Sequence, residues 1–366
     1  MAKGVLEGVR IVEFEGMGPA PFCGMMLADH GADVVRISRP GGNQGGAPLP
    51  AAKFDVMGRG RRRIELDLKD PAAIATCLNL LEHADAMLEG YRPGVMERLG
   101  LGPDVVLAKN PRLAYARMTG WGQSGPYSPL AGHDINYIAT NGALHGIGPA
   151  DKPVPPLNLV GDFGGGAMFM AFGVVSAILN ARTTGQGQVI DCAMVDGATS
   201  LMAAIWGLHG AGDWRDSRES NLIDGGAHFY ATYRCGDGKW VAVGAIEPLF
   251  YKILLDKLGL DDPDLEAWGN PAKWAAMGAR FQEKFLTRSR DEWTATFAGT
   301  DACFAPILSM GEAPADPHNV ARATFVVVDG VTQPAPAPRF LRTPGAVQEK
   351  AAEPDGDTIL AQWRAQ

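Results

Sequence analysis

The feature that most constrains the fold is an alternation of short apolar strands with helices along the first part of the chain. VRIVEF (residues 9–14) is typical of a buried strand, residues 16–21 form a glycine- and proline-rich turn, and ADVVRI (residues 32–37) predicts a second strand after a helix. The same order recurs with a helix over residues 71–83 and with strands in DAMLEGY and RLAYARM. This alternation predicts an α/β fold in which helices cover the faces of a parallel sheet.

The pattern changes in the second half of the chain. The strand-to-helix stretch GQVIDCAMVDG is followed by an irregular tract over residues 206–226, and FYATYRCGDGKWVAVGAIE then alternates around a GDG turn as a β-hairpin does. We therefore expect a large domain over residues 1–200, a linker over 201–226, a small α+β domain over 227–318 and a return segment over 319–366 that packs on the large domain.

Composition excludes several classes of protein. The 366 residues are 46% hydrophobic, which is enough for two domains, and a net charge of −8 argues against a binder of nucleic acid or anionic membranes. Five scattered cysteines without a CxxC spacing indicate neither a disulfide framework nor a zinc site, so we expect no metal. The first residues contain no apolar stretch of the signal-peptide kind, and we expect a cytoplasmic protein.

One uncharged segment, FGGGAMFMAFGVVSAILN (residues 163–180), is nearly long enough to span a bilayer. It is rich in glycine, follows Asp162, precedes Arg182 and stands alone in a chain of ordinary polarity. We therefore interpret it as a helix buried in protein and expect no membrane partner.

Basic residues gather near the ends of the predicted strands. The first turn resembles the start of GxGxxG but has Pro21 in place of the third glycine, so it fails as a dinucleotide signature. The second strand ends in Arg36 and Arg39 rather than in an acidic residue. Such a cluster favours a polyanionic ligand at the carboxyl edge of the sheet, although each arginine taken singly is typical of a solvated surface. The further members are Arg59, Arg61, Arg62, Arg63, Lys69, Arg92 and Arg98.

Four titratable residues are candidates for catalysis. In AGHDINYIATNG, His133 and Asp134 are neighbours, so on a regular element they point to different partners. Asp162 precedes three glycines at the predicted start of the apolar helix, where it either caps the helix or acts as an acid/base beside an oxyanion site. Glu247 ends a predicted strand, either as an exposed carboxylate or as a partner that fixes the tautomer of His133.

Several blocks in this order resemble the α-methylacyl-CoA racemases of the class III CoA-transferase (CaiB/BaiF) superfamily. They are GADVVRISRP, GYRPG, ARMTGWGQSGP, GHDINY, LVGDFGGG, MVDG and GAIEP. The resemblance implies a large Rossmann-like domain, a smaller α+β domain and an interlocked homodimer that acts on an acyl-CoA substrate. The implied reaction is epimerisation of 2-methylacyl-CoA thioesters by removal and return of the α-proton through an enolate.

The resemblance also assigns roles to residues. His133 and Asp162 would be the acid/base groups, Glu247 would pair with His133, and Asp134 would lie near Asp162, with the glycine-rich helix start at 164–166 stabilising the enolate oxygen. No cofactor is expected beyond the coenzyme A moiety of the substrate. The implied coenzyme A contacts are Arg39, Leu66, Asp67, Leu68, Lys69, Gly90, Tyr91, Arg92, Arg98, Gly132 and Tyr137.

Two alternatives stay open. A CoA-transferase of the same superfamily would use Asp162 as a nucleophile that forms an acyl anhydride. A non-catalytic acyl-CoA carrier or an NADP-linked binding module would keep the arginines without needing the acid/base set. The chain also departs from the family pattern, which usually has proline where His228 stands and glutamine where Leu249 stands, so the acyl specificity does not follow from the resemblance.

Overall fold

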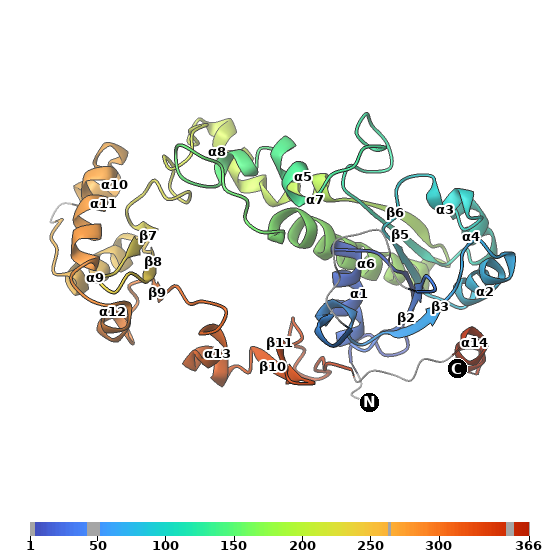
Figure 1. Cartoon of the computed structure of the whole chain (residues 1–366). Coiled ribbons are helices and arrows are strands. Elements are labelled where there is room, and N and C mark those ends of the chain that lie inside the picture. The colour runs from blue at the N-terminus through green and yellow to red at the C-terminus, as the bar shows by residue number, and fades with distance from the viewer. Residues whose placement is uncertain (1–3, 42–51, 263–264, 349–354, 366) are drawn as a thin grey trace. The chain divides into compact units, whose positions relative to one another are not determined.

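The computed structural model describes residues 4–41, 52–262, 265–348 and 355–365. The chain divides into two compact units, whose elements are labelled in Figure 1. The first unit comprises residues 1–141, 157–201 and 322–366, and the second comprises residues 142–156 and 202–321.

This division differs from the expected one at residues 319–321, which belong to the second unit, and in two longer stretches. Residues 142–156 group with the second unit although they lie within the expected large domain. The expected linker over 201–226 also belongs to the second unit and contains helix α8 (Ala203–Ala211), which ends at Gly212 in the left-handed conformation. The sequence AAIWGLHGA has no polar stripe, so its periodicity gave no sign of a helix.

Six strands in the described part of the first unit form one parallel sheet. Their order is β3-β2-β1-β4-β5-β6, so the direction of winding reverses between β1 and β4. This arrangement confirms the predicted Rossmann-like α/β fold. The strands are β1 (Arg10–Phe14), β2 (Asp33–Ser38), β3 (Arg62–Glu65), β4 (Ala86–Glu89), β5 (Ala114–Thr119) and β6 (Gln188–Ala193).

Helices cover both faces of this sheet because successive strand residues point to opposite sides. Ile11 packs into a core with α1 (Pro19–Asp29) and α6 (Met168–Thr184). Its neighbour Val12 packs into a second core with α2 (Pro71–Glu82), α4 (Pro103–Lys109) and α14 (Gly356–Arg364). The shorter helices of this unit are α3 (Val95–Arg98), α5 (Asp134–Thr140) and α7 (Met194–Leu201).

The return segment contributes an antiparallel hairpin of β10 (Phe325–Val328) and β11 (Val331–Pro334). Arg59 ties this hairpin to the first unit, because its Nη1 donates to Gln333 Oε1 at 2.7 Å and to the Pro334 carbonyl at 2.9 Å. The segment therefore belongs to the first unit through buried polar contacts.

The apolar segment differs from the expected α-helix. Residues Leu159–Ala167 form a π-helix that runs directly into α6, so Asp162 lies inside a helical segment and does not cap one. Only one face of α6 is buried, since Phe172 and Leu179 are 74% and 67% exposed. By length and composition alone, the continuous helix Leu159–Thr184 is also the one helix among the described residues that could cross a membrane.

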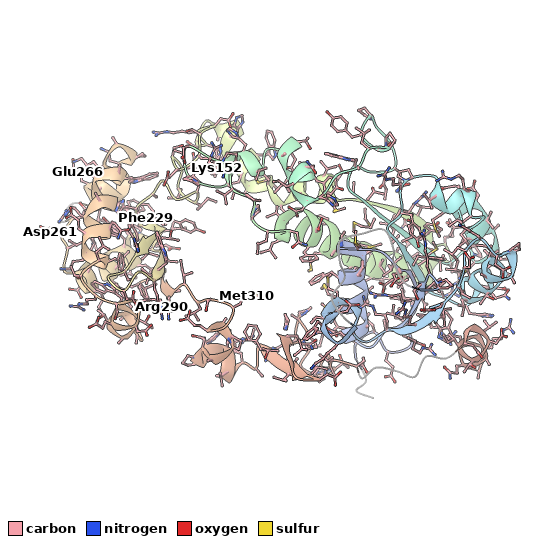
Figure 2. The ribbon with its side chains drawn as sticks, in the orientation of Figure 1. Lys152, Phe229, Asp261, Glu266, Arg290 and Met310 are labelled. Carbon is pink, nitrogen blue, oxygen red and sulfur yellow. The ribbon has the colours of Figure 1, made fainter. Side chains whose placement is uncertain are left out.

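The second unit combines an antiparallel sheet with helices. Strands β7 (Tyr230–Arg234) and β8 (Trp240–Gly244) form the predicted hairpin, and β9 (Phe304–Pro306) pairs with β8. Its core is rich in aromatic side chains, including Phe229, while Asp261 and Glu266 lie on the outer surface (Figure 2). The remaining helices are α9 (Pro248–Leu258), α10 (Glu266–Gly269), α11 (Pro271–Phe285), α12 (Arg290–Phe297) and α13 (Pro317–Ala321).

Candidate active site

A cavity of about 440 Å³ opens at the carboxyl ends of the strands of the first unit. It lies where the winding of the sheet reverses, because its wall includes the residues that follow β1 and β4. In open α/β sheets this crevice is the usual place for ligands. The lining residues are Glu15, Gly16, Met17, Gly18, Pro19, Arg39, Gly90, Tyr91, Arg92, Gly132, His133, Tyr137, Asp162 and Met194.

His133 directly precedes α5, and it lines this cavity. Its backbone N–H donates to Asn136 Oδ1 at 3.0 Å, which fixes the start of the helix. Tyr137 secures the preceding loop, because its hydroxyl donates to the Gly132 carbonyl and its ring stacks edge-on against Trp121. A Cβ at Gly132 would lie 2.7 Å from that ring, so glycine is required there. These contacts fix the backbone from which His133 reaches the cavity wall.

Asp134, the neighbour of His133, points into the protein instead. It is buried, and its Oδ2 accepts a 2.7 Å hydrogen bond from the backbone N–H of Asp162. This approach needs a glycine at position 161, where a Cβ would lie 2.6 Å from the same oxygen. The two adjacent residues therefore have different tasks: His133 faces the cavity, while Asp134 holds the π-helical segment that carries Asp162.

Asp162 faces the cavity from this π-helical segment. Burial raises the pKa of its carboxyl group, and the charge of Asp134 raises it further, against the opposing effects of a hydrogen bond from Asn158 and the nearby His133. The start of α1 lies close to this carboxylate, since a Cβ added at Gly18 would be 3.3 Å from Asp162 Oδ2. The raised pKa makes this carboxylate a stronger base than an ordinary aspartate, which suits a group that accepts and returns a proton.

The glycines after Asp162 do not have the expected position. A Cβ at Gly165 would lie 2.4 Å from the backbone nitrogen of Ala198, and one at Gly166 would lie 2.9 Å from Met194 Cγ. These glycines therefore allow α7 to pack closely against the π-helix. Residues 164–166 are absent from the described lining of the cavity, so the expected oxyanion role for them has no support.

Most of the arginine cluster has a structural role. Arg36 and Arg61 both bind the buried carboxylate of Glu13, at 2.9 and 3.0 Å. Arg59 pairs with Asp29, Arg62 with Asp33, and Arg63 with Glu65. Each of these residues thus has an acidic partner within the unit and is absent from the described lining of the cavity, which favours a structural role for them. Arg39 and Arg92 are exposed and line the cavity, so they are the arginines placed to meet an anionic ligand.

The other expected site residues lie outside the described lining of the cavity. Leu66 to Lys69 form a turn after β3, in which Asp67 Oδ1 accepts from the Lys69 N–H at 3.1 Å, and Arg98 ends the short helix α3. Glu247 belongs to the second unit, where it is exposed and directly precedes α9. The sequence analysis missed Glu15, Met17 and Met194, which line the cavity. The signal for Glu15 and Met17 was their position directly after the first strand of a parallel sheet, and the signal for Met194 was its position directly after β6.

Comparisons with known proteins match nearly the whole chain. The family model for CoA-transferase family III matches residues 6–358. The chain is 44% identical to the alpha-methylacyl-CoA racemase of Mus musculus, over 94% of this chain and 89% of that protein. It is 43% identical to the alpha-methylacyl-CoA racemase of Homo sapiens, over 93% of this chain and 87% of that protein.

The fold has a close counterpart among solved structures. A CaiB/BaiF family protein from Brucella suis superposes with a TM-score of 0.82 at 24% identity, and the match covers 99% of this chain and 100% of the other. The structural likeness supports the fold, and the sequence matches extend along nearly the whole chain. The chain belongs to CoA-transferase family III.

Proposed function

We propose that this chain interconverts the (2R) and (2S) epimers of 2-methylacyl-CoA thioesters. The observation that carries the proposal is that His133 and Asp162 line one cavity, at whose wall Arg39 and Arg92 also lie. Two similar relatives are named alpha-methylacyl-CoA racemase, which supports the same reaction. The cavity thus combines two proton-transfer groups with two cations for an anionic substrate.

The chemistry requires only movement of a proton. One of the two groups removes the proton from Cα, the electron pair of the broken C–H bond moves into the thioester to form a planar enolate, and the other group protonates the opposite face. A positive potential near the thioester oxygen lowers the energy of the enolate. The first turn of α1 lies at the cavity and adds the positive end of its helix dipole there. Asp134 holds Asp162 in place through its backbone N–H.

Coenzyme A enters as part of the substrate, and we propose that no other cofactor is used. Its phosphates would meet Arg39 and Arg92, whose guanidinium groups suit phosphate oxygens. Because the protein itself supplies both proton-transfer groups and a positive potential for the enolate, we expect dialysis against a chelator to leave the rate of epimerisation unchanged. A rate that falls on dialysis and recovers with an added divalent metal would contradict this part of the proposal.

A CoA-transferase is the second candidate, because Asp162 reaches the cavity and the family takes its name from that activity. In this reaction the Asp162 carboxylate attacks the thioester carbonyl and expels the thiolate of coenzyme A, which leaves an acyl anhydride on the enzyme. The thiolate then attacks the aspartyl carbonyl of this anhydride and releases the first acid. The second carboxylate attacks the resulting aspartyl thioester and expels the thiolate as a new anhydride forms. Attack of the thiolate on the acyl carbonyl of that anhydride gives the second acyl-CoA and frees Asp162. His133 has no required part in this scheme, whereas epimerisation by two bases needs it.

Proton exchange in deuterated water tests the proposal. One epimer of a 2-methylacyl-CoA is incubated with the protein without an acceptor acid, and deuterium at Cα is followed together with the ratio of epimers. We expect deuterium to enter while stereochemical purity is lost. The transferase would replace the racemase if neither change occurred and coenzyme A moved only after a free acid was added.

We also propose that the chain forms a homodimer in the cytoplasm and acts in lipid metabolism. Support for a dimer comes from the outer face of α6, where five apolar side chains are exposed, which is unusual for a solvated helix. Light scattering of the purified protein measures the state directly, and a monomer at micromolar concentration would contradict it. The exposed side chains are Met168, Phe169, Phe172, Val175 and Leu179.

A further inference from the structure

The turn of residues 90–92, which lines the cavity and includes Arg92, is hydrogen-bonded to a buried carboxylate. Glu89, the last residue of β4, is completely buried. Its Oε2 accepts a 2.7 Å hydrogen bond from the Tyr91 backbone N–H, and its Oε1 accepts a 2.9 Å bond from Nε of Arg117. A short bond from a buried carboxylate to a loop N–H restricts the loop strongly, since either partner alone would be left unsatisfied.

Arg117 continues the connection to the far end of the same segment. It lies on β5 directly beside Glu89 in the strand register. Its Nη1 and Nη2 also bind the two carboxylate oxygens of Glu97 on α3, at 2.7 and 3.2 Å. One guanidinium therefore joins the start of the segment 89–97 to its end, and Arg92 stands between the two attachments.

This arrangement exceeds what packing of the sheet requires. Burying charged groups costs free energy, and an apolar residue at position 117 would fill the same layer, as its neighbour Tyr115 does on the same face. Arg117, Glu89 and Glu97 lie outside the described lining of the cavity, so proton transfer does not use them. The contacts of these three residues all restrain the turn 90–92, whose last residue is the exposed Arg92.

We infer that Arg117 is a positioning residue that fixes the turn 90–92 through Glu89 and Glu97, so that Arg92 is already placed for the anionic part of the acyl-CoA substrate. The inference rests on the proposed function, because it assigns Arg92 to the coenzyme A moiety. Its effect is on substrate affinity, since a loop that must be ordered at the moment of binding weakens binding.

The test uses Glu97→Gln in the full-length protein, because the Glu97 side chain is 44% exposed and its loss leaves the core intact. Binding of free coenzyme A is measured by calorimetry, and KM and kcat are measured in the exchange assay. We expect Kd and KM to rise about tenfold, the size of effect typical of coupled contacts, while kcat changes little.

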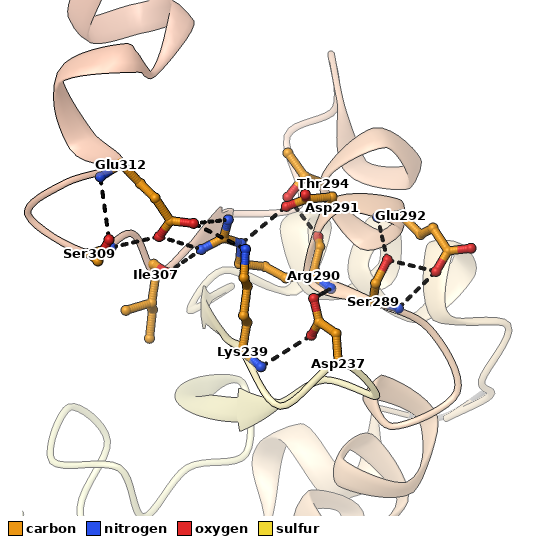
Figure 3. Close-up of polar contacts among 10 residues, drawn as sticks. All are labelled: Asp237, Lys239, Ser289, Arg290, Asp291, Glu292, Thr294, Ile307, Ser309 and Glu312. Carbon is orange, nitrogen blue, oxygen red and sulfur yellow. Dashed lines mark hydrogen bonds and ion pairs between the residues drawn. The ribbon is translucent and has the colours of Figure 1, made fainter.

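Glu312→Gln in the second unit is the matched control. Glu312 binds Arg290 with both carboxylate oxygens, at 2.8 and 3.0 Å, and its side chain is 35% exposed, much like Glu97 (Figure 3). This substitution removes the same kind of contact, a carboxylate bound to a buried arginine, but outside the turn 90–92. We therefore expect the Kd for coenzyme A to stay unchanged. An equal loss of affinity in both variants would reduce Arg117 to a general stabilising role and overturn the inference.

A double-variant cycle identifies the route of the effect. In an Arg92→Ala background the turn has no cation to place, so adding Glu97→Gln should weaken coenzyme A binding no further. If the two effects multiply, the contact acts elsewhere and the inference fails. Unaltered Kd in the single variant Glu97→Gln also overturns it and leaves the proposed function standing. Absence of coenzyme A binding by the unaltered protein would overturn both.

Discussion

The two units bury charge in different ways. In the first unit, Glu13 and Glu89 sit at the carboxyl ends of β1 and β4 and are completely buried, one on each face of the sheet. Each pairs with an arginine directly beside it on the neighbouring strand, Glu13 with Arg36 and Glu89 with Arg117. These pairs lie at the carboxyl ends of the strands, next to the residues that line the cavity.

The second unit relies on an aromatic core instead. Arg290 and Glu312 form its clearest ion pair, but the acid is partly exposed and also binds Lys239 at the surface (Figure 3). Within the core, His228 Nε2 and the Tyr251 hydroxyl form a hydrogen bond at 2.9 Å, and that hydroxyl donates to Asp262. The difference teaches that the first unit fixes chain segments, including those that form the site, through buried ion pairs, whereas the second unit relies mainly on apolar packing.

The largest effect is expected where the first unit carries chemistry. Asp162→Asn should lower the rate of α-proton exchange by about 10²–10⁴, because the amide cannot transfer the proton. Coenzyme A affinity should change far less, since Arg39 and Arg92 remain. Deuterium incorporation measures the rate, and Asp301→Asn, an exposed site in the second unit, serves as the control. A residual rate close to that of the unaltered protein would move the chemistry away from this cavity.

The comparison of buried charge is tested by Arg59→Leu in the first unit. Arg59 and Asp29 are 7% and 3% exposed, and removing the cation leaves a buried carboxylate without a partner. We expect a loss of about 3–5 kcal/mol in the free energy of unfolding of the first unit. Hydrogen exchange resolved by peptide measures the two units separately. Glu312→Gln should affect only peptides of the second unit, and to a smaller extent.

The second unit should respond to pH through His228. Burial lowers the pKa of His228 from its ordinary value of 6.5 to about 4, so between these values the unfolded chain binds a proton that the folded chain does not. Stability of the second unit therefore declines as pH falls from about 6.5 to about 4, by up to about 3 kcal/mol.

His228→Gln removes this titration and keeps a group that can bond to Tyr251. Denaturant unfolding followed by tryptophan fluorescence reports on the second unit, which holds six of the eight tryptophans: Trp206, Trp214, Trp240, Trp268, Trp274 and Trp293. We expect a flatter dependence of its stability on pH in the variant. Identical pH curves for both proteins would show that other groups govern the acid limb.

Local patterns predicted much of this architecture. Strands β1, β2, β4 and β5 and helices α1 and α2 follow from apolar runs and turn residues, and the hairpin follows from its GDG turn, where Gly238 has φ of 81°. Strand β3 was not predicted, because its sequence RRIE was interpreted only as part of the basic cluster. The π-helix was missed because its form depends on distant partners: Asp134 binds its backbone, and Ala198 presses against Gly165. The spacing of apolar residues in the sequence gives no information about either contact.

The arginines show the same limit for the site. A charge in a sequence does not reveal its partner, and Glu13 lies 23 and 48 residues from the two arginines that it binds. Arg39 and Arg92 look no different in the sequence from Arg59 or Arg61, yet only the first two line the cavity. The parallel sheet decides which basic residues reach its carboxyl edge and which turn inward.

The smallest effect is expected for an exposed arginine that lies outside the described lining of the cavity. Arg63 pairs with Glu65 at 3.2 Å while the side chains are 38% and 49% exposed, and such a pair contributes at most about 1 kcal/mol to stability. Arg63→Ala should therefore leave both the melting temperature and the Kd for coenzyme A nearly unchanged, whereas Arg92→Ala should raise that Kd about tenfold through loss of a contact to phosphate. If Arg63→Ala weakened binding as much as Arg92→Ala, the ligand would extend past β3, and the basic residues after that strand would return to the binding site.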